Sequence, residues 1–534
     1  MESKVTAFAG TGWVATVAIA LSSLGCGDST MTSADDSDAV DARVDGQHPN
    51  LPSTSPSVSV DVDIPDDAAP PARDPEAGIY GIWYGHNPTV LSSPYLRGGQ
   101  VVVQWSDCEP EEGHYDFSAI LQEVESLCQS GHTAIVQVNG SDKPDYLFDK
   151  VPYLPEKVHQ QVKDEKGSLM FWHPTFRNAY LDFISAYAAA VKASPASDCI
   201  KGIRQNFNCF GTEICWINGL YATQQSEWVI PAGVSYVQPT QAVIEQYQQA
   251  VLSRFLSAFT PEIPVFVRVG ISDEAIEAHA SFFEDAMAGW FQTCDSLEPN
   301  YDCQNDSRYT RYLAYCKPGI TFGFAERSAA RHTELGTGAE YWRVLGDLHF
   351  GVSYIGTRGH VFESAANGNP WTMKTLEMAN TYAGYHALPA ASPGAWIAFR
   401  GKGTNYSGDY TFHMTSEPNP SLIDRKGIGG TAVPYGVWAQ ELPEGQELVV
   451  TPDPDFLASL SAASLKVIWF DRSFGGGTIA GRAGDFLFTI TPNGTGAWRE
   501  TTFALPETQF DHIVLRAKNG SVIFHMVAVV REMK

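Results

Sequence analysis

Short apolar runs rich in β-branched and aromatic residues alternate with stretches of helical periodicity between residues 78 and 400. In the stretch 240–258, apolar residues lie four apart, at Val243, Tyr247, Val251 and Phe255, and form one face of a helix. Eight strands that alternate with helices over about 320 residues predict an α/β fold, a (β/α)8 TIM barrel over residues 78–400. The eight runs are 79–84, 100–105, 133–138, 200–207, 265–269, 320–324, 352–356 and 395–399.

An open, doubly wound parallel sheet is the competing architecture for the same alternation. Its commonest use is to bind a dinucleotide at a glycine-rich turn after the first strand, and no such turn follows the run 79–84. The barrel is therefore the expected fold.

The pattern changes after a joint rich in glycine and asparagine at 401–408. Strand-like runs then follow one another with turns between them, and a short stretch near 457–463 is the only helical one. Strands at this spacing predict an all-β sandwich over residues 405–534. The runs are 448–450, 465–470, 485–491, 498–503, 512–516 and 522–530.

Length and charge limit the classes of protein that this chain can be. Its 534 residues suggest two or three folded units, in agreement with a barrel and a sandwich. The formal net charge of −26 opposes binding to a phosphate backbone, so we expect no nucleic-acid partner. Residues 27–77 carry −10 of this charge, twelve acids against Arg43 and Arg73, and hold no aromatic residue. Such a segment cannot bury enough apolar surface to fold, so we expect a disordered acidic tether.

The N-terminus has the features of an export signal. After a lysine near the start, an apolar stretch at 14–24 leads to SLGC at 23–26, which is similar to a bacterial lipobox. We therefore expect a signal peptide at 1–26, with Cys26 lipidated and anchoring the protein in a bacterial outer or cytoplasmic membrane. The alternative is a plain secretory peptide, which would leave the protein periplasmic or extracellular.

Nine cysteines also fit an exported chain. Setting Cys26 aside leaves eight, an even number that favours four disulfides, and Cys108–Cys128 and Cys294–Cys303 are the simplest local pairs. The sequence contains no CxxC pair, and no histidine lies at ligand spacing from these cysteines. We therefore expect neither a metal site nor a cofactor.

Acidic residues at the C-terminal ends of the expected barrel strands are the candidates for catalysis, because catalytic residues of TIM barrels lie there. Glu213 follows the fourth run, with Trp216 close behind, and Glu363 follows the seventh. Glu326, after the sixth run, is the rival of Glu363. Two carboxyls that face each other across a barrel mouth suit glycoside hydrolysis. One protonates the leaving oxygen, and the other attacks the anomeric carbon or activates a water.

Residues 105–117, WSDCEPEEGHYDF, resemble the element after the second barrel strand in retaining glycoside hydrolases of clan A, especially those similar to β-galactosidases. The resemblance implies a TIM barrel with an acid/base glutamate after the fourth strand and a nucleophilic glutamate after the seventh. Glu213 and Glu363 stand in those places. The clan has asparagine before the acid/base residue, whereas this chain has Thr212, with Gly211 before it.

Several tryptophans in loops or at strand ends are candidate walls for a bound substrate, because aromatic faces stack on the CH faces of sugars. They are Trp83, Trp105, Trp172, Trp216 and Trp371. The C-terminal sandwich resembles the jelly-roll accessory modules that follow polysaccharide-active domains, and it either binds glycan or braces the barrel.

These features predict an exported glycoside hydrolase that cleaves a β-linked oligo- or polysaccharide by a retaining, double-displacement mechanism. Carbohydrate and, through the lipid, the bacterial membrane are its expected partners. The alternative is a non-catalytic, surface-anchored glycan-binding lipoprotein on a TIM-barrel scaffold, which the Thr212 departure favours.

Overall fold

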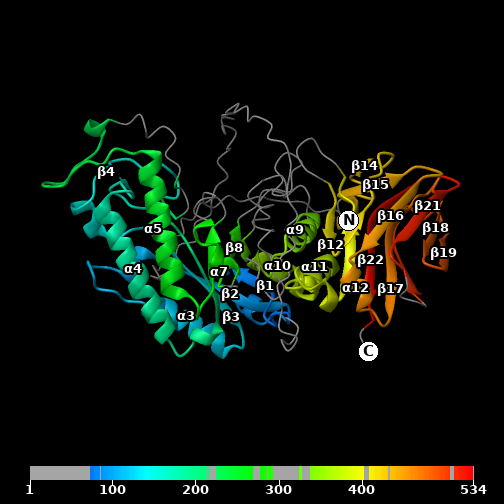
Figure 1. Ribbon diagram of the computed structural model, residues 1–534, viewed down its shortest axis with the longest axis horizontal. Helices are drawn as coiled ribbons and strands as arrows, with labels where there is room; N and C mark the ends of the chain where they lie inside the picture. Colours follow the sequence, from blue (N-terminus) through cyan, green and yellow to red (C-terminus); the bar gives the residue numbers. More distant parts are fainter. Residues whose placement is uncertain are drawn as a thin grey trace, which may run out of the picture. The chain divides into compact units, whose positions relative to one another are not determined.

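The chain folds into a closed parallel barrel followed by two antiparallel sheets (Figure 1). This confirms the expected α/β fold, a TIM barrel followed by an all-β sandwich. Met1–Ala68 and Ala69–Lys534 are separate units, and all described residues lie in the second. The computed structural model describes residues 72–84, 86–212, 215, 224–268, 277–284, 287–292, 324–326, 337–401, 408–430, 433–505 and 510–532.

Eight parallel strands close the barrel, and β1 pairs with both β2 and β10 to complete the ring. The strands follow one another around the ring in the order of the chain, as in a TIM barrel. They are β1 (Gly78–Ile82), β2 (Leu96–Gln104), β3 (Thr133–Asn139), β6 (Ile200–Arg204), β7 (Val265–Arg268), β8 (Ala288–Gln292), β9 (Phe324–Glu326) and β10 (Tyr354–Arg358).

Helices pack around the outside of these strands (Figure 1). The long ones begin at residues whose side chains accept from free backbone N–H groups of the first turn: His173 before α4, Thr240 before α5 and Asn369 before α11. The helices are α1 (Pro88–Leu91), α2 (Trp105–Cys108), α3 (Ser118–Gln129), α4 (Pro174–Ala193), α5 (Gln241–Phe259), α7 (Ala280–Glu284), α9 (Thr337–His349), α10 (Gly359–Ala366) and α11 (Pro370–Tyr382). A two-stranded hairpin of β4 (Tyr153–Leu154) and β5 (Ser168–Leu169) lies in the loop after β3.

Part of the barrel interior is filled by buried apolar side chains. Two glycines make room for the largest rings. A Cβ at Gly202 would lie 2.1 Å from the Phe266 ring, and one at Gly98 would lie 2.3 Å from the Tyr80 ring. The interior is therefore a packed core, not a pore, which leaves the mouth of the barrel for a site. The cluster consists of Tyr80, Ile82, Ile135, Phe266 and Tyr354.

One of the eight expected barrel strands is wrong. The run 395–399 lies in β11 (Gly394–Ala398), which pairs antiparallel with β22 (Val522–Arg531) of the C-terminal region. The barrel strand that the sequence pattern missed is β8, a five-residue AGWFQ segment interrupted by a glycine. β9 is therefore the seventh barrel strand and β10 the eighth, and the barrel ends before residue 394 rather than at 400.

Burial on both faces explains why β11 resembles a barrel strand. Ala395 and Ile397 belong to the core between the two antiparallel sheets, whereas Trp396 and Ala398 belong to the core shared with the barrel helices. Parallel barrel strands are also buried on both faces and give the same continuous apolar run. The local pattern therefore could not distinguish the two settings.

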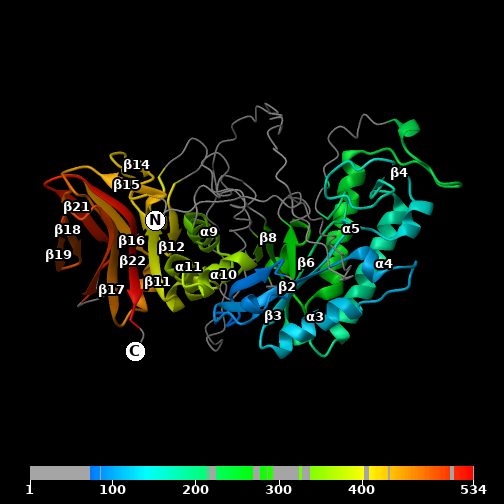
Figure 2. The same cartoon turned by 180° about the vertical axis from the view of Figure 1, so that it is seen from behind.

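Two antiparallel sheets form the C-terminal sandwich (Figure 2). Along β17 and β21, buried residues such as Leu465 and Leu515 alternate with more exposed ones and build the core between the sheets. One sheet contains β11, β12 (Tyr410–Phe412), β14 (Ile423–Lys426), β15 (Trp438–Leu442), β17 (Ala463–Asp471), β20 (Ala497–Leu505) and β22. The other contains β13 (Met414–Ser416), β16 (Glu447–Pro452), β18 (Thr478–Ala483), β19 (Phe486–Ile490) and β21 (Ile513–Lys518), and α12 (Pro454–Ala458) lies between β16 and β17.

The outer face of the first sheet packs against the barrel helices. The hydroxyl of Tyr341 on α9 lies 2.9 Å from Nε2 of His525 on β22, and Nε1 of Trp342 donates to the Pro434 carbonyl at 2.8 Å. Both tyrosine and histidine are buried. The sandwich therefore braces the barrel through this face, which we call the seam.

The end of the expected tether belongs to the barrel. Arg73 donates to three backbone carbonyls, one of them in α11 and one directly after it, and the Tyr354 hydroxyl donates to the Asp74 carboxylate. Disorder up to residue 77 is therefore wrong for residues 72–77. The rest of the tether and the signal peptide with Cys26 lie outside the described residues. Within the part of the chain that is described, no helix has the length and apolarity that crossing a membrane would need.

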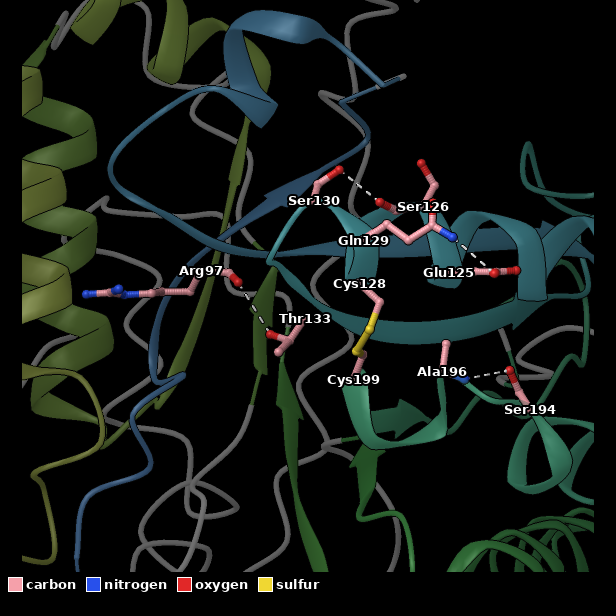
Figure 3. The surroundings of a disulfide bond; sticks show 10 residues. All are labelled: Arg97, Glu125, Ser126, Cys128, Gln129, Ser130, Thr133, Ser194, Ala196 and Cys199. Carbon is pink, nitrogen blue, oxygen red and sulfur yellow. Dashed lines mark hydrogen bonds between the residues drawn. A yellow bond between two sulfur atoms is a disulfide. The ribbon is translucent and has the colours of Figure 1, made fainter.

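A disulfide joins Cys128 at the end of α3 to Cys199 just before β6, with their Cα atoms 5.8 Å apart (Figure 3). The bond links parts of the chain 71 residues apart and holds two neighbouring units of the barrel together. The expected Cys108–Cys128 pair is therefore wrong. Cys108 lies in α2, before the start of α3, whereas Cys128 lies near the end of α3, about 15 Å along the helix axis from its first residue.

Cys108 is buried and unpaired among the described residues. A second disulfide joins Cys209 and Cys215 in the loop after β6. The expected Cys294–Cys303 pair lies outside the described residues.

Candidate functional site

The candidate site lies at the C-terminal ends of the barrel strands, where TIM barrels hold their catalytic residues. Glu213 and Trp216, which follow β6 in the sequence, lie outside the described residues. In the described ranges, no three His, Cys, Asp or Glu side chains gather as a metal site would require. The strand ends and the loop residues next to them define the site.

Glu326 ends β9, the seventh barrel strand. Its backbone is level with Gly356 of β10, which is in turn level with Tyr80 of β1. The end of the seventh strand is where the clan A resemblance requires the nucleophile. By position, Glu326 and not Glu363 therefore ends the seventh strand.

Glu363 lies in α10, after the eighth strand, and its side chain is exposed. Its Oε1 accepts a 2.7 Å hydrogen bond from Nδ2 of Asn87, the residue that precedes α1. The expectation that Glu363 follows the seventh strand is wrong, because β8 adds a strand that the sequence pattern did not count. Glu363 instead links α10 to the loop after β1.

A network of buried polar side chains lies inside the barrel, with Gln137 of β3 at its centre. Its Oε1 accepts from Nη1 of Arg204 at 2.6 Å and from Nε2 of Gln100 at 3.0 Å. Its Nε2 donates to Oδ1 of Asn139 at 2.8 Å. Side chains two apart on a strand share a face, so Ile135, Gln137 and Asn139 all point into the barrel.

Sequence reasoning missed this network because it searched for carboxylates. The signal was present in β3, where TAIVQVN places an amide at every second position near the end of an otherwise apolar strand. A buried amide costs free energy unless it is hydrogen-bonded, so a run of them inside a barrel indicates more than packing.

The loop after β6 is held in an unusual conformation. Asn208 has a φ of +48° and Gly211 a φ of +65°, both in the left-handed region. The Thr212 hydroxyl lies 3.0 Å from that of Ser141 in the loop after β3. Among the described residues, the buried Oδ1 atoms of Asn206 and Asn208 have no hydrogen-bond partner. A left-handed asparagine and unpaired buried oxygens are features that cluster at functional sites.

A buried ion pair fixes the loop after β3. Nζ of Lys143 lies 3.9 Å from Oδ2 of Asp164, and the backbone N–H of Lys143 donates to Oδ1 of Asp164 at 2.8 Å. Burial lowers the pKa of Lys143 to about 8 and raises the pKa of Asp164 to about 6. Ser141 of the same loop contacts Thr212, the residue before Glu213. The Lys143–Asp164 pair therefore holds the segment that makes this contact.

Trp83 directly follows β1 and remains a candidate for contact with a sugar. Its side chain is 49% exposed, and its φ of +47° lies in the left-handed region. His86, in the same loop, also has a positive φ of +54°. A bulky residue adopts this region only where its surroundings demand it, which makes the loop a defined feature of the mouth.

Trp105 and Trp172 are wrong as walls of a sugar site. Trp105 is fully buried and packs among aromatic rings of α4, and Trp172 is 3% exposed and donates to the Val237 carbonyl at 2.9 Å. Both rings fill the core, where a large apolar surface contributes most to stability. Trp371, at the start of α11, is half-buried with its ring 5.0 Å from that of Tyr435, so it supports the seam.

The segment 105–117 builds the loop after β2. Glu109 is buried and accepts from Nε1 of Trp105 at 2.8 Å, from the backbone of Gly113 at 3.0 Å and from the hydroxyl of Tyr146 at 2.9 Å. Burial raises the pKa of Glu109, and these three donors act against that shift. Glu109 therefore has a structural role in this motif.

The family model described as β-galactosidase, of glycoside hydrolase family 42, matches residues 100–197. The matched part begins in β2, contains the 105–117 segment and ends after α4. The match confirms the resemblance to β-galactosidase-like glycoside hydrolases in this part of the barrel, less than a fifth of the chain. A search of curated proteins finds no match.

Solved structures similar to this chain include two β-galactosidases. That from Rahnella sp. R3 is 13% identical, with a TM-score of 0.34, and the alignment covers 58% of this chain and 57% of that one. A family 42 β-galactosidase from G. stearothermophilus is 11% identical, with a TM-score of 0.37 and coverages of 60% and 58%. This chain thus spans less than two thirds of either relative. The module CsCBM6-3 from Clostridium stercorarium, solved with cellobiose, is 16% identical over 22% of this chain and 87% of its own, with a TM-score of 0.17.

Proposed function

We propose that this chain is a glycoside hydrolase that cleaves a β-linked oligo- or polysaccharide with retention at the anomeric carbon. The observation that carries the proposal is the position of Glu326 at the end of the seventh strand of a closed barrel whose 100–197 segment matches the β-galactosidase family. Glu213, next in sequence to Thr212, is the second carboxyl. Glu326 replaces Glu363 as the proposed nucleophile.

In the first step, the Glu326 carboxylate attacks the anomeric carbon while the Glu213 carboxyl protonates the leaving oxygen, and the glycosidic C–O bond breaks. In the second step, Glu213 takes a proton from a water molecule whose oxygen attacks the anomeric carbon and releases Glu326. Two inversions give net retention. This sequence requires the two carboxyl groups to lie about 5–5.5 Å apart.

The clan's asparagine before the acid/base residue has no counterpart here, because the Thr212 hydroxyl is engaged with Ser141. We propose that an amide of the β6 loop takes over its contact with the substrate. Asn206 and Asn208 support this, since each has a buried Oδ1 without a partner in the described residues. Such an oxygen gains most from accepting a hydrogen bond from a sugar hydroxyl.

The test compares Glu326→Ala, Glu213→Ala and Glu363→Ala on aryl β-glycosides. Glu326→Ala should lower kcat by about a thousandfold or more, and azide should restore part of it by forming a glycosyl azide of inverted configuration. Glu213→Ala should retain the first step for substrates with good leaving groups, which need no proton. Azide rescue of an inactive Glu363→Ala variant, with Glu326→Ala still active, would contradict the assignment.

A second candidate function is non-catalytic glycan binding at the cell surface, which the threonine at position 212 favours. In that case wild type and Glu213→Gln would bind the same polysaccharide with equal affinity, and neither would release sugar.

We also propose that the protein is exported and lipidated at Cys26, which would place it on a bacterial outer or cytoplasmic membrane. The SLGC sequence at 23–26 and the acidic segment that follows support this. Cys26→Ser should then move to the soluble periplasmic or extracellular fraction. Identical fractionation of the two proteins would contradict lipidation.

A further inference from the structure

We propose that Phe474, at one end of the C-terminal sandwich, binds a sugar ring of a β-linked polysaccharide outside the barrel. Its side chain is 93% exposed, more than any other large apolar side chain in the described ranges. The inference goes beyond the proposed glycoside hydrolase function, because Phe474 lies outside the barrel and touches no reacting group. Only the choice of a β-linked polysaccharide as the ligand rests on that function.

Three loops meet at this end of the sandwich, and we call them the tip. β17 ends at Asp471, which pairs with Ala497 at the start of β20. The neighbouring Phe470 pairs with Ile523 near the start of β22. The loops next to these strand ends therefore lie side by side. They are residues 472–477, 491–496 and 519–521.

Hydrogen bonds fix the first loop of the tip on both sides of Phe474. Before the ring, the buried carboxylate of Asp471 accepts from the backbone N–H groups of residues 493–495 at 2.9–3.0 Å. After the ring, the N–H of Gly477 donates to the Ser521 carbonyl at 2.9 Å. The loop is therefore held in place while its aromatic side chain stays exposed, so a ligand binds there at a small cost in conformational entropy.

A buried carboxylate holds the start of the same loop. Nη2 of Arg472 lies 2.9 Å from Oε2 of Glu441 on β15, and Nη1 donates to the Ser521 hydroxyl at 2.8 Å. Because Ser521 belongs to the third loop of the tip, the guanidinium ties two of the loops to the sheet. Its positive charge is thereby paired within the protein.

Two asparagines lie beside the Phe474 loop, one in each of the other loops of the tip. A Cβ at Gly494 would lie 3.3 Å from the carbonyl oxygen of the residue before Phe474, and one at Gly520 would lie 2.9 Å from that of the residue after it. Asn493 and Asn519 directly precede these glycines, and both are exposed. An aromatic face with amides nearby suits a sugar ring, because its CH face stacks and its hydroxyls both donate and accept hydrogen bonds.

The composition of the tip distinguishes a sugar from other partners. Apart from Phe474, Arg472 and Pro492, the three loops consist of glycine, asparagine, serine and threonine. A protein partner or a second copy buries about 800 Å² on each side, and one phenylalanine ring supplies at most about 250 Å² of apolar surface. An anionic membrane attracts basic residues, but Arg472, the one basic residue of these loops, is paired with Glu441.

The test compares Phe474→Ala, Phe474→Leu and Phe474→Tyr in the full chain. Leucine keeps an apolar side chain without a ring, whereas tyrosine keeps the ring. Leu487→Ala is the matched control, because Leu487 is a 72% exposed apolar residue on β19 of the same sandwich. The Kd values for galactan, mannan, xylan and cellulose are measured from binding isotherms, and kcat/KM is measured on p-nitrophenyl β-glycosides.

Phe474→Ala should raise the Kd of each polysaccharide that wild type binds by about five- to tenfold, as loss of one aromatic contact predicts. Phe474→Leu should lose as much affinity, because stacking requires the ring. Phe474→Tyr and Leu487→Ala should bind as wild type does. Hydrolysis of the aryl glycosides should change no more in Phe474→Ala than in Leu487→Ala, because these small substrates report on the barrel.

Equal affinity of wild type and Phe474→Ala for these polysaccharides would overturn the inference, and so would wild-type affinity in Phe474→Leu. Two further measurements address the other partners: sedimentation velocity, and binding to phosphatidylethanolamine–phosphatidylglycerol vesicles in the Cys26→Ser background, which lacks the proposed lipid. Loss of self-association or of vesicle binding in Phe474→Ala, with sugar binding unchanged, would make Phe474 a contact for a second copy or a membrane instead.

The failure of this inference and the failure of the proposed function are distinguishable. A wild type that binds none of the four polysaccharides overturns the inference, whether or not it cleaves aryl glycosides. Binding without turnover contradicts the proposed function, while the Kd values of the Phe474 variants still decide the role of the ring.

Discussion

The barrel and the sandwich fill their interiors with different kinds of side chain. Inside the barrel, rings such as Tyr80 and Phe266 are accompanied by a buried network of amides and a guanidinium around Gln137. Between the sandwich sheets, the core consists of side chains such as Leu465 and Leu515. Buried polar groups cost stability unless they are paired, whereas apolar ones add to it. The barrel interior therefore keeps polar groups that cost stability unless they are paired, whereas the sandwich interior contributes stability through apolar burial.

The largest expected effect on stability lies on the barrel side, at the Lys143–Asp164 pair. Asp164→Asn keeps an oxygen for the backbone N–H of Lys143 but leaves a buried lysine charge without its partner. We expect the free energy of unfolding to fall by about 3–5 kcal/mol at pH 7, measured by urea denaturation.

The loss of stability in Asp164→Asn should depend on pH. Burial lowers the pKa of Lys143 to about 8 even with the Asp164 charge raising it, and removal of that charge lowers the pKa further. The lysine of the variant therefore loses its proton at lower pH than that of wild type, and the loss of stability should shrink as the pH rises toward 8. The double variant Lys143→Met/Asp164→Asn should recover most of it, since both charges are removed while the oxygen that accepts from the Lys143 backbone N–H is kept. Wild-type stability in Asp164→Asn would show that the pair does not secure the loop.

An effect of intermediate size is expected in the sandwich core. Leu465→Ala removes a fully buried side chain and should lower the free energy of unfolding by about 3 kcal/mol. Leu487→Ala in β19 is the control, because that leucine is 72% exposed and its loss should cost less than about 0.5 kcal/mol. Neither effect should vary between pH 5 and 8. If the loss of stability in Leu465→Ala depended strongly on pH, the difference between the polar barrel interior and the apolar sandwich interior would not hold.

The smallest effect is expected at the seam, where His525 is buried between the two regions. Burial, with Lys374 nearby, lowers the pKa of His525 to about 3. The unfolded histidine titrates near 6.5, so the stability contribution is complete above pH 6.5 and is lost progressively as the pH falls toward 3. At pH 5 the loss should be about 2 kcal/mol.

His525→Gln retains a polar group opposite Tyr341 but does not titrate. Its stability, measured by thermal and urea unfolding, should therefore fall less than that of wild type between pH 7 and pH 5. Equal pH dependence in the two proteins would mean that the seam does not respond to acid.

The candidate site was only partly predictable from sequence. The 105–117 segment and the carboxylates after the strands could be identified from the sequence, because a motif and a strand end each depend on adjacent residues. The Gln137 network was not, since its members come from β2, β3 and β6 and meet only in the barrel. The same holds for Asn87 and Glu363, which lie 276 residues apart in the chain.

The sequence by itself determined the barrel class and the change to a sandwich, because burial periodicity is a local property of the chain. Tertiary structure alone decided which strands form the barrel. An apolar run reports that both faces are buried, but not what buries them, and β11 obtains that burial from β22, more than 120 residues later. The apolar run in β8 is short and contains a glycine, so the sequence pattern does not identify it as a strand. That single exchange of strands moves the seventh strand end from Glu363 to Glu326, because position around a ring depends on long-range pairing that no local pattern encodes.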